Sequence, residues 1–237
     1  MARTVAALAL ALLSSPALAH GLAHLDGDGN KVTQARSPGD FEAVRLEGPL
    51  DAEVKVGRPP SAAVTIDANL QEAVEVRVED RTLVVSMRRG VSYRGAGKVE
   101  IGAPRLTAFT LRGSGDARIE GSSGGDLRLS LEGSGDLRWA GGAARTLEAE
   151  IEGSGDMDLG GAAEELRLSL RGSGAVHARG LVARSARVRV SGSGDVDLTL
   201  GGGSLDAEVS GSGDVRWSGE ARVERAAVSG SGEISRR

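Results

Sequence analysis

Five aspartates occupy the same position of a short motif, Gly-Ser-Gly-acid, that recurs along the second half of the chain: Asp116, Asp136, Asp156, Asp195 and Asp214. Carboxylate oxygens gathered by short turns are ligands that Ca²⁺ prefers, so one hypothesis is a column of cations. The other is that backbone N–H groups of the glycine-rich turns hold each carboxylate by a hydrogen bond. We favour hydrogen bonding at Asp136 and Asp156, because Ala175 interrupts the series and would break a continuous ladder of ions.

The other polar residues provide no catalytic or metal-binding pattern. No His combines with a Ser and an Asp in a recognisable triad order, and a chain without cysteine has no thiol chemistry. His20 could bind copper through a free amino terminus with His24 nearby, but that segment is not expected to be ordered. His177 falls at an outward strand position and is expected to be solvated. We therefore predict no catalytic, cofactor-binding or metal-binding residue.

Sugar chemistry is the main alternative. Polysaccharide lyases and hydrolases need clustered carboxylates, and their sites usually carry aromatic side chains that stack on sugar rings. The chain has one Tyr, two Phe and two Trp. Trp139 and Trp217 fall in the inward register of the strands, which favours core packing, although a register slip would expose them as sugar platforms. The prediction is a non-enzymatic protein, with a carbohydrate-active enzyme on the same scaffold as the alternative.

The motif that carries these aspartates is an internal repeat. GSGD, GSGA or GSGE begins seven times, at intervals of 20, 20, 19, 20, 19 and 19 residues. On both sides of each turn apolar residues alternate with mostly polar ones, as in half-buried β-strands. The apolar residues two positions before each turn are Leu111, Leu131, Ile151, Leu170, Val190, Val209 and Val228.

Such a repeat predicts a stack of coils. A unit with two short strands and two bends cannot bury its apolar face alone, but identical neighbours can cover it. We therefore predict an all-β fold, a right-handed parallel β-helix with coils of about 20 residues. A propeller blade needs about twice this period, and a sandwich would not require one turn seven times. The stack should align Leu131, Ile151 and Leu170 in one inward column, and strand alternation predicts that the turn serines also point inward.

The first residues are typical of an export signal. Residues 1–19 have a positive start, a short apolar run and the cleavage pattern Ala17-Leu18-Ala19. Cleavage after Ala19 predicts a periplasmic or secreted protein. The apolar run is too short to span a bilayer and no second one follows, so we expect no membrane span after cleavage. The net charge of −4, with acids and bases interleaved, makes nucleic acid an improbable partner.

The rest of the chain divides into three predicted segments. Residues 20–39 lack periodicity and are predicted to form a flexible leader. Residues 40–112 contain alternating strands that should begin and cap the solenoid, with a hairpin turn at Asp80-Arg81. Residues 113–237 form the repeat solenoid. Glycine at the turns supplies the sharp corner that every coil must share.

The strand-bend-strand opening "FEAVRLEGPLDAEVKVG", the strand "LVVSM" and the approach "KVEIGAPRLTAFTLRGSGD" to the first turn resemble the GIN domain, also described as an auto-transporter adhesin head domain. The resemblance covers roughly Phe41 to Ile234. It implies an exported, often bacterial, all-β protein without catalytic residues. We therefore expect an adhesin-like or scaffolding module whose partner is a cell-envelope glycan or a surface protein. Its oligomeric state is not specified by these patterns.

Overall fold

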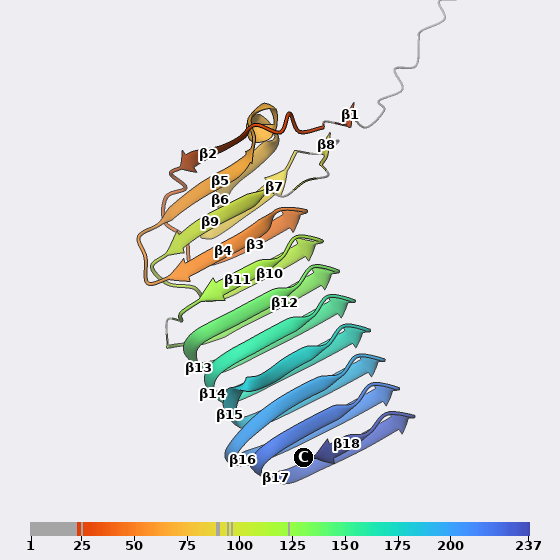
Figure 1. Cartoon of the computed structure of the whole chain (residues 1–237). Helices are drawn as coiled ribbons and strands as arrows, with labels where there is room; N and C mark the ends of the chain where they lie inside the picture. Colours follow the sequence, from red (N-terminus) through yellow and green to blue (C-terminus); the bar gives the residue numbers. More distant parts are fainter. Residues whose placement is uncertain (1–22, 25, 89–90, 94, 96, 123) are drawn as a thin grey trace, which may run out of the picture.

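The computed structural model describes residues 23–24, 26–88, 91–93, 95, 97–122 and 124–237. Its main body is a stack of parallel β coils, with antiparallel strands and one short 3₁₀ helix at the N-terminal end (Figure 1). This confirms the predicted β-solenoid and its coil length of about 20 residues. The predicted signal peptide, residues 1–19, and His20 lie outside the described residues.

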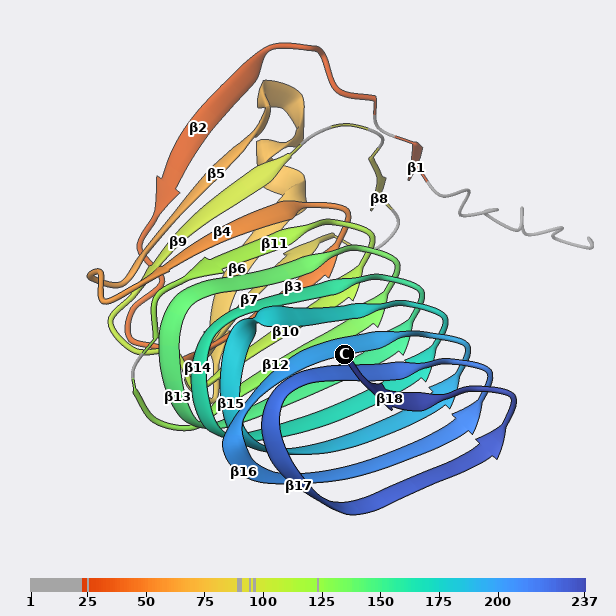
Figure 2. The ribbon, with the colours of Figure 1, turned by 60° about the horizontal axis from the view of Figure 1, so that its bottom comes forward.

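Each full coil is built from one long strand that folds back on itself, as Figure 2 shows. Pairing between coils continues through the glycine-rich bend, where Gly142 aligns with Gly161, so the strand is not interrupted there. Register shifts mark these bends, as between Trp139 and Gly142, because an inserted residue bends a strand. The long strands are β13 (Leu137–Gly153), β14 (Met157–Gly172), β15 (Val176–Gly192), β16 (Val196–Gly211) and β17 (Val215–Gly230).

The first coils use shorter strands in the same register. β3 (Ala43–Gly48) pairs in parallel with β10 (Ala108–Gly113), and β4 (Asp51–Val56) pairs with β11 (Ala117–Glu120). β12 (Leu127–Gly133) lies between β10 and β13 in the sheet and pairs in parallel with both. The bend after β3 therefore takes the place of a Gly-Ser-Gly turn, with Gly48 aligned to Gly113.

A cap closes the N-terminal end of the stack. β7 (Thr82–Met87) pairs in parallel with β3 and β9 (Lys98–Ala103) with β4, while β6 (Val74–Glu79) and β5 (Ser61–Asp67) add antiparallel partners. The 3₁₀ helix η1 (Ala68–Ala73) joins β5 to β6. Asp80 and Arg81 have φ angles of 47° and 61° between β6 and β7, which confirms the predicted hairpin turn. The short β1 (Ala23–His24) pairs with β8 (Val91–Ser92).

The predicted leader is wrong for part of its length. Residues 31–36, placed in an irregular segment by the sequence, form β2 (Lys31–Arg36), which pairs antiparallel with β5 over six residues. Its side chains are mostly exposed, so the apolar alternation that marks a buried strand is weak here. Backbone pairing with β5 places this strand, together with a hydrogen bond between the hydroxyls of Thr33 and Thr65 and one that Gln71 donates to the carbonyl of Val32.

The interior confirms the predicted column. Leu131 aligns with Ile151, and Ile151 with Leu170, on successive parallel strands, and all three are at most 1% exposed. Trp139 is fully buried and its indole N–H donates to the carbonyl of Gly121 at 2.9 Å. Trp217 is 6% exposed. Both indoles therefore belong to the core, as predicted, and neither forms a sugar platform.

The C-terminal end carries a partly open sheet edge. β18 (Ile234–Arg236) pairs with Val215–Trp217 at the start of β17. The later part of β17 has no further strand beside it among the described residues, and Val223 and Val228 are 46% and 44% exposed. A register shift at Glu224 bends this edge. Bulges and edge charges hinder pairing with another strand.

Candidate functional site

The Gly-Ser-Gly turns stack coil upon coil. Their first glycines have φ angles between 129° and 138°, a region that glycine adopts far more easily than other residues. The N–H of each following serine reaches back to the first glycine of the preceding turn, as when Ser154 donates to the carbonyl of Gly133 at 3.0 Å. The turn column thus links neighbouring coils through their backbones.

The prediction that the turn serines point inward is wrong. Ser134 and Ser154 are exposed, whereas the second glycines, Gly135 and Gly155, are buried. Strand alternation does not continue through the turn, because the positive φ of the first glycine redirects the chain. A Cβ built on Gly155 would overlap the carbonyl oxygen of Gly135. The inward position therefore requires glycine, and the serine hydroxyl faces outward.

The turn aspartates form a ladder of hydrogen bonds. The Oδ1 atom of each accepts the backbone N–H of the equivalent residue in the next coil. Asp116 accepts from Asp136 at 2.9 Å, Asp136 from Asp156 at 3.0 Å, and Asp156 from Ala175 at 2.7 Å. This confirms that Asp136 and Asp156 are held by turn N–H groups. Within the described part of the chain, no group of three or more His, Asp or Glu side chains is arranged to hold a metal ion.

Ala175 is the missing carboxylate of this ladder. The N–H of Ala175 is held by Asp156, but its methyl group cannot accept the N–H of Asp195 in the next coil. We expect Ala175→Asp to raise the melting temperature by a few degrees, since one net hydrogen bond contributes about 1 kcal/mol. Thermal unfolding followed by circular dichroism measures it. Ala175→Asn is the control, because it adds the same acceptor without a further stacked charge. Melting below the parent for both variants would contradict the ladder.

The front face is the second feature of interest. We define it as the outward side chains of β4, β11 and the first parts of β13 to β17. One register row crosses all of these strands, and it consists of Glu53, Arg118, Arg138, Asp158, His177, Asp197 and Arg216.

Most charges of this row are paired. Lys98 contacts Glu53 at 2.6 Å and, together with Lys55, lowers the pKa of that carboxyl to about 2. Arg118 contacts Glu120 at 2.9 Å. Arg216 contacts the turn residue Asp195 at 3.1 Å, and this hydrogen bond raises the pKa of the guanidinium. The ends of the row are therefore electrostatically satisfied.

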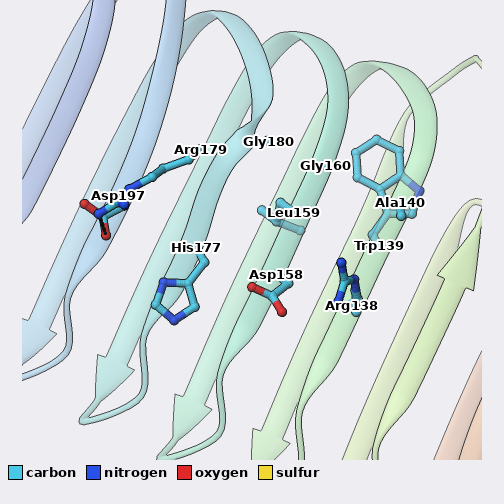
Figure 3. A pocket seen from close by; sticks show the side chains of 10 residues that line it. All are labelled: Arg138, Trp139, Ala140, Asp158, Leu159, Gly160, His177, Arg179, Gly180 and Asp197. Atoms are coloured by element: carbon cyan, nitrogen blue, oxygen red, sulfur yellow. Dashed lines mark hydrogen bonds and ion pairs between the residues drawn. The ribbon is translucent and has the colours of Figure 1, made fainter.

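The middle of the row is not paired. Arg138, Asp158 and His177 are exposed on three successive coils (Figure 3), and none of their side chains has a hydrogen bond or ion pair within the described part of the chain. Two residues beyond Arg138 and Asp158 stand Ala140 and Gly160. Ala140 aligns with Glu120 of one neighbouring coil, and Gly160 aligns with Gly180 of another. These small residues leave a hollow of about 450 Å³ beside the unpaired charges. We call it the central hollow.

The rim of the central hollow is fixed by an ion pair. Arg179 donates to Oδ2 of Asp197 at 2.9 Å (Figure 3). Asp197 is only 9% exposed, and its Oδ1 atom has no hydrogen-bond partner among the described residues, although Nη1 of Arg237 lies 3.8 Å away. Since that oxygen is buried, it is not available to a molecule in the hollow. Asp197 therefore orients Arg179.

A second hollow continues the first along the stack. It has a volume of about 590 Å³ and shares Arg138, Asp158 and His177 with the central hollow. It reaches to the cap, where Lys98 lies. The turn aspartates that line it are Asp51, Asp116, Asp136 and Asp156. Together the two hollows form a groove that crosses the coils along the front face.

The back face, formed by the outward side chains of β3, β10, β12 and the later parts of β13 to β17, is different. There, arginines and acids at one register position of adjacent coils pair directly. Arg112 contacts Glu132 at 2.9 Å and Arg128 contacts Glu148 at 2.6 Å. The matching front-face neighbours, Arg138 and Asp158, do not. The groove thus combines a concave shape with unpaired charge.

Sequence reasoning missed this groove. It placed His177 correctly on the outside, but as an isolated solvated residue, and it named no site residue. A signal was present: in two successive repeats a charged outward residue is followed, two positions later, by Ala140 or Gly160. That departure is visible only once the repeats are aligned and the outer face is known.

The stacked coils define a parallel β-solenoid, with a groove on its front face. The family model described as "Putative auto-transporter adhesin, head GIN domain" matches residues 40–221, so the chain belongs to this family. The resemblance seen in the sequence is confirmed. No curated protein matches the chain. No helix among the described residues has both the length and the apolar character needed to cross a membrane.

Several solved structures share the fold. A "putative adhesin" from Bacteroides fragilis is 22% identical, with a TM-score of 0.81, over 90% of this chain and 100% of that one. A "putative lipid binding protein" from Parabacteroides distasonis is 23% identical, with a TM-score of 0.70, over 90% and 99%. A "putative adhesin" from the same species is 25% identical, with a TM-score of 0.67, over 90% and 100%. The family is thus described as an adhesin head domain, and these neighbours share the fold of this chain.

Proposed function

We propose that the protein is an exported binding module that holds a glycan of the cell envelope in the groove of its front face. The unpaired charges of Arg138 and Asp158 beside the central hollow carry this proposal. At the ends of the row, and in the pairs Arg112–Glu132 and Arg128–Glu148 of the back face, comparable charges are neutralised by neighbours. Polar groups left without protein partners in a concave site are those that a polar ligand can use for orientation and specificity. The export signal ending at Ala19 is part of the proposal.

A glycan suits the groove better than a folded protein does. The groove is lined mainly by charged and small residues, whereas the centres of protein interfaces are rich in aromatic anchors and poor in charge. The two tryptophans of the chain are in the core. Sugar hydroxyls donate and accept hydrogen bonds, so they can meet both the guanidinium of Arg138 and the carboxylate of Asp158.

A glycan array probed with the full chain tests the proposal. We expect retention of a set of glycans, and a loss of about tenfold or more in affinity for the double variant Arg138→Ala, Asp158→Ala, since hydrogen bonds to charged groups are strong. The matched control is Arg128→Ala, Glu148→Ala, which removes one base and one acid at a single register position of the back face. Absence of any glycan binding, or equal losses in both variants, would contradict the proposal.

A further inference from the structure

We propose that the central hollow recognises a sugar residue that bears a single carboxylate, flanked in its polymer by uncharged sugars. This inference rests on the proposed function and specifies the ligand of the same groove. Three observations carry it: the free guanidinium of Arg138, the adjacent free groups of Asp158 and His177, and the acidic lining of the second hollow.

Arg138 supplies the contact to the carboxylate. Its guanidinium is exposed, and Asp158 at the same register position of the next coil leaves it unpaired. A guanidinium binds a carboxylate through two parallel N–H···O bonds, with a geometry that a hydroxyl group cannot reproduce. Arg179 cannot take this role, because Asp197 already accepts from it at 2.9 Å. Among the residues that line the central hollow, Arg138 is the free cation of fixed charge.

Asp158 limits what else can bind in the central hollow. A carboxylate accepts hydrogen bonds only, so Asp158 requires a donor such as a sugar hydroxyl. Its negative charge beside Arg138 also penalises a ligand group of higher charge, such as a phosphate dianion. A single carboxylate with hydroxyls on the same ring satisfies both demands. Ala140 and Gly160 leave the space for that ring.

The second hollow determines the neighbours of the acidic sugar. Asp116, Asp136 and Asp156 each use one carboxylate oxygen for the N–H of the next coil. Their charges line the path of a polymer that runs along the stack. They repel a second carboxylate, whereas uncharged sugars can donate hydroxyls to them. A polymer with an acid on every residue is therefore disfavoured, and one with acids separated by uncharged sugars is favoured.

Three oligosaccharides of equal length separate these possibilities by calorimetry or biolayer interferometry. The first is hyaluronan, in which glucuronic acid alternates with N-acetylglucosamine. The second is the same oligosaccharide with its carboxyl groups reduced, and the third is oligogalacturonate, with an acid on every residue. We expect hyaluronan to bind about tenfold or more tightly than either of the others, since a charge-assisted pair separates them. Arg138→Gln should abolish the preference over the reduced form, while Arg128→Gln on the back face should keep it.

The outcomes distinguish this inference from the function on which it rests. Equal binding of hyaluronan and its reduced form, or tighter binding of oligogalacturonate, overturns the inference and leaves glycan binding intact. Failure of all three to bind, when the array shows other ligands, also overturns it. Failure of every glycan on the array overturns the proposed function itself.

Discussion

Gly153→Val is expected to lower the melting temperature by about 10 °C. Two independent free-energy costs, one of backbone conformation and one of steric overlap, add at Gly153. Gly153 has a φ of 138°, and a Cβ there would overlap the backbone carbonyl of Gly133 in the preceding coil. Left-handed backbone costs a non-glycine residue about 1–2 kcal/mol, and overpacking costs about 1–3 kcal/mol more. Since about 1 kcal/mol shifts melting by 2–4 °C in a domain of this size, thermal unfolding by circular dichroism or calorimetry resolves the change easily.

Glu150→Ala is the control for that experiment. Glu150 lies three residues before Gly153 on β13, faces outward, and contacts Arg171 at 2.8 Å with both side chains largely exposed. Exposed ion pairs contribute about 0–1 kcal/mol, so we expect a shift of at most a few degrees. Equal losses for Gly153→Val and Glu150→Ala would contradict the close approach of the turn backbones.

The alignment of these turns shows what a repeat makes predictable. Seven copies at nearly constant pitch fix which residues share a column, and the column of Leu131, Ile151 and Leu170 follows directly. The orientation of Ser134 and Ser154 does not follow, because alternation assumes an extended backbone and the first glycine of each turn departs from it. Repetition thus predicts register better than it predicts the direction of side chains within a turn.

The two remaining differences have a different origin. β2 pairs with β5 through main-chain hydrogen bonds. Residues 31–36 show little apolar alternation, so the sequence does not indicate a strand there. The groove depends on the small size of Ala140 and Gly160. It also depends on Arg138 and Asp158, whose side chains do not form an ion pair with each other. Patterns of polarity report what is buried. They do not report a missing side chain on the outer surface, which becomes meaningful only against its neighbours in space.

The second large effect on the melting temperature is expected when acceptors of the aspartate ladder are removed. The double variant Asp136→Ala, Asp156→Ala removes the acceptors for the N–H groups of Asp156 and Ala175. Each of these hydrogen bonds contributes about 1 kcal/mol, so the loss of both should lower the melting temperature by about 4–8 °C. The double variant Asp136→Asn, Asp156→Asn keeps an oxygen at each position and relieves the repulsion of stacked carboxylates. It should melt close to the parent protein.

Calcium separates this ladder from a column of bound cations. A cation held only by the folded protein, at 100 times its dissociation constant, would add about 2.7 kcal/mol of stability, or several degrees. Because each Oδ1 is already occupied by a backbone N–H, we expect the parent to melt at the same temperature in millimolar calcium and in excess chelator. A rise with calcium that disappears in the asparagine double variant would replace the hydrogen-bonded ladder with a metal-bound one. Coincident curves, with a loss confined to the alanine double variant, would show that the oxygen atoms matter and their charges do not.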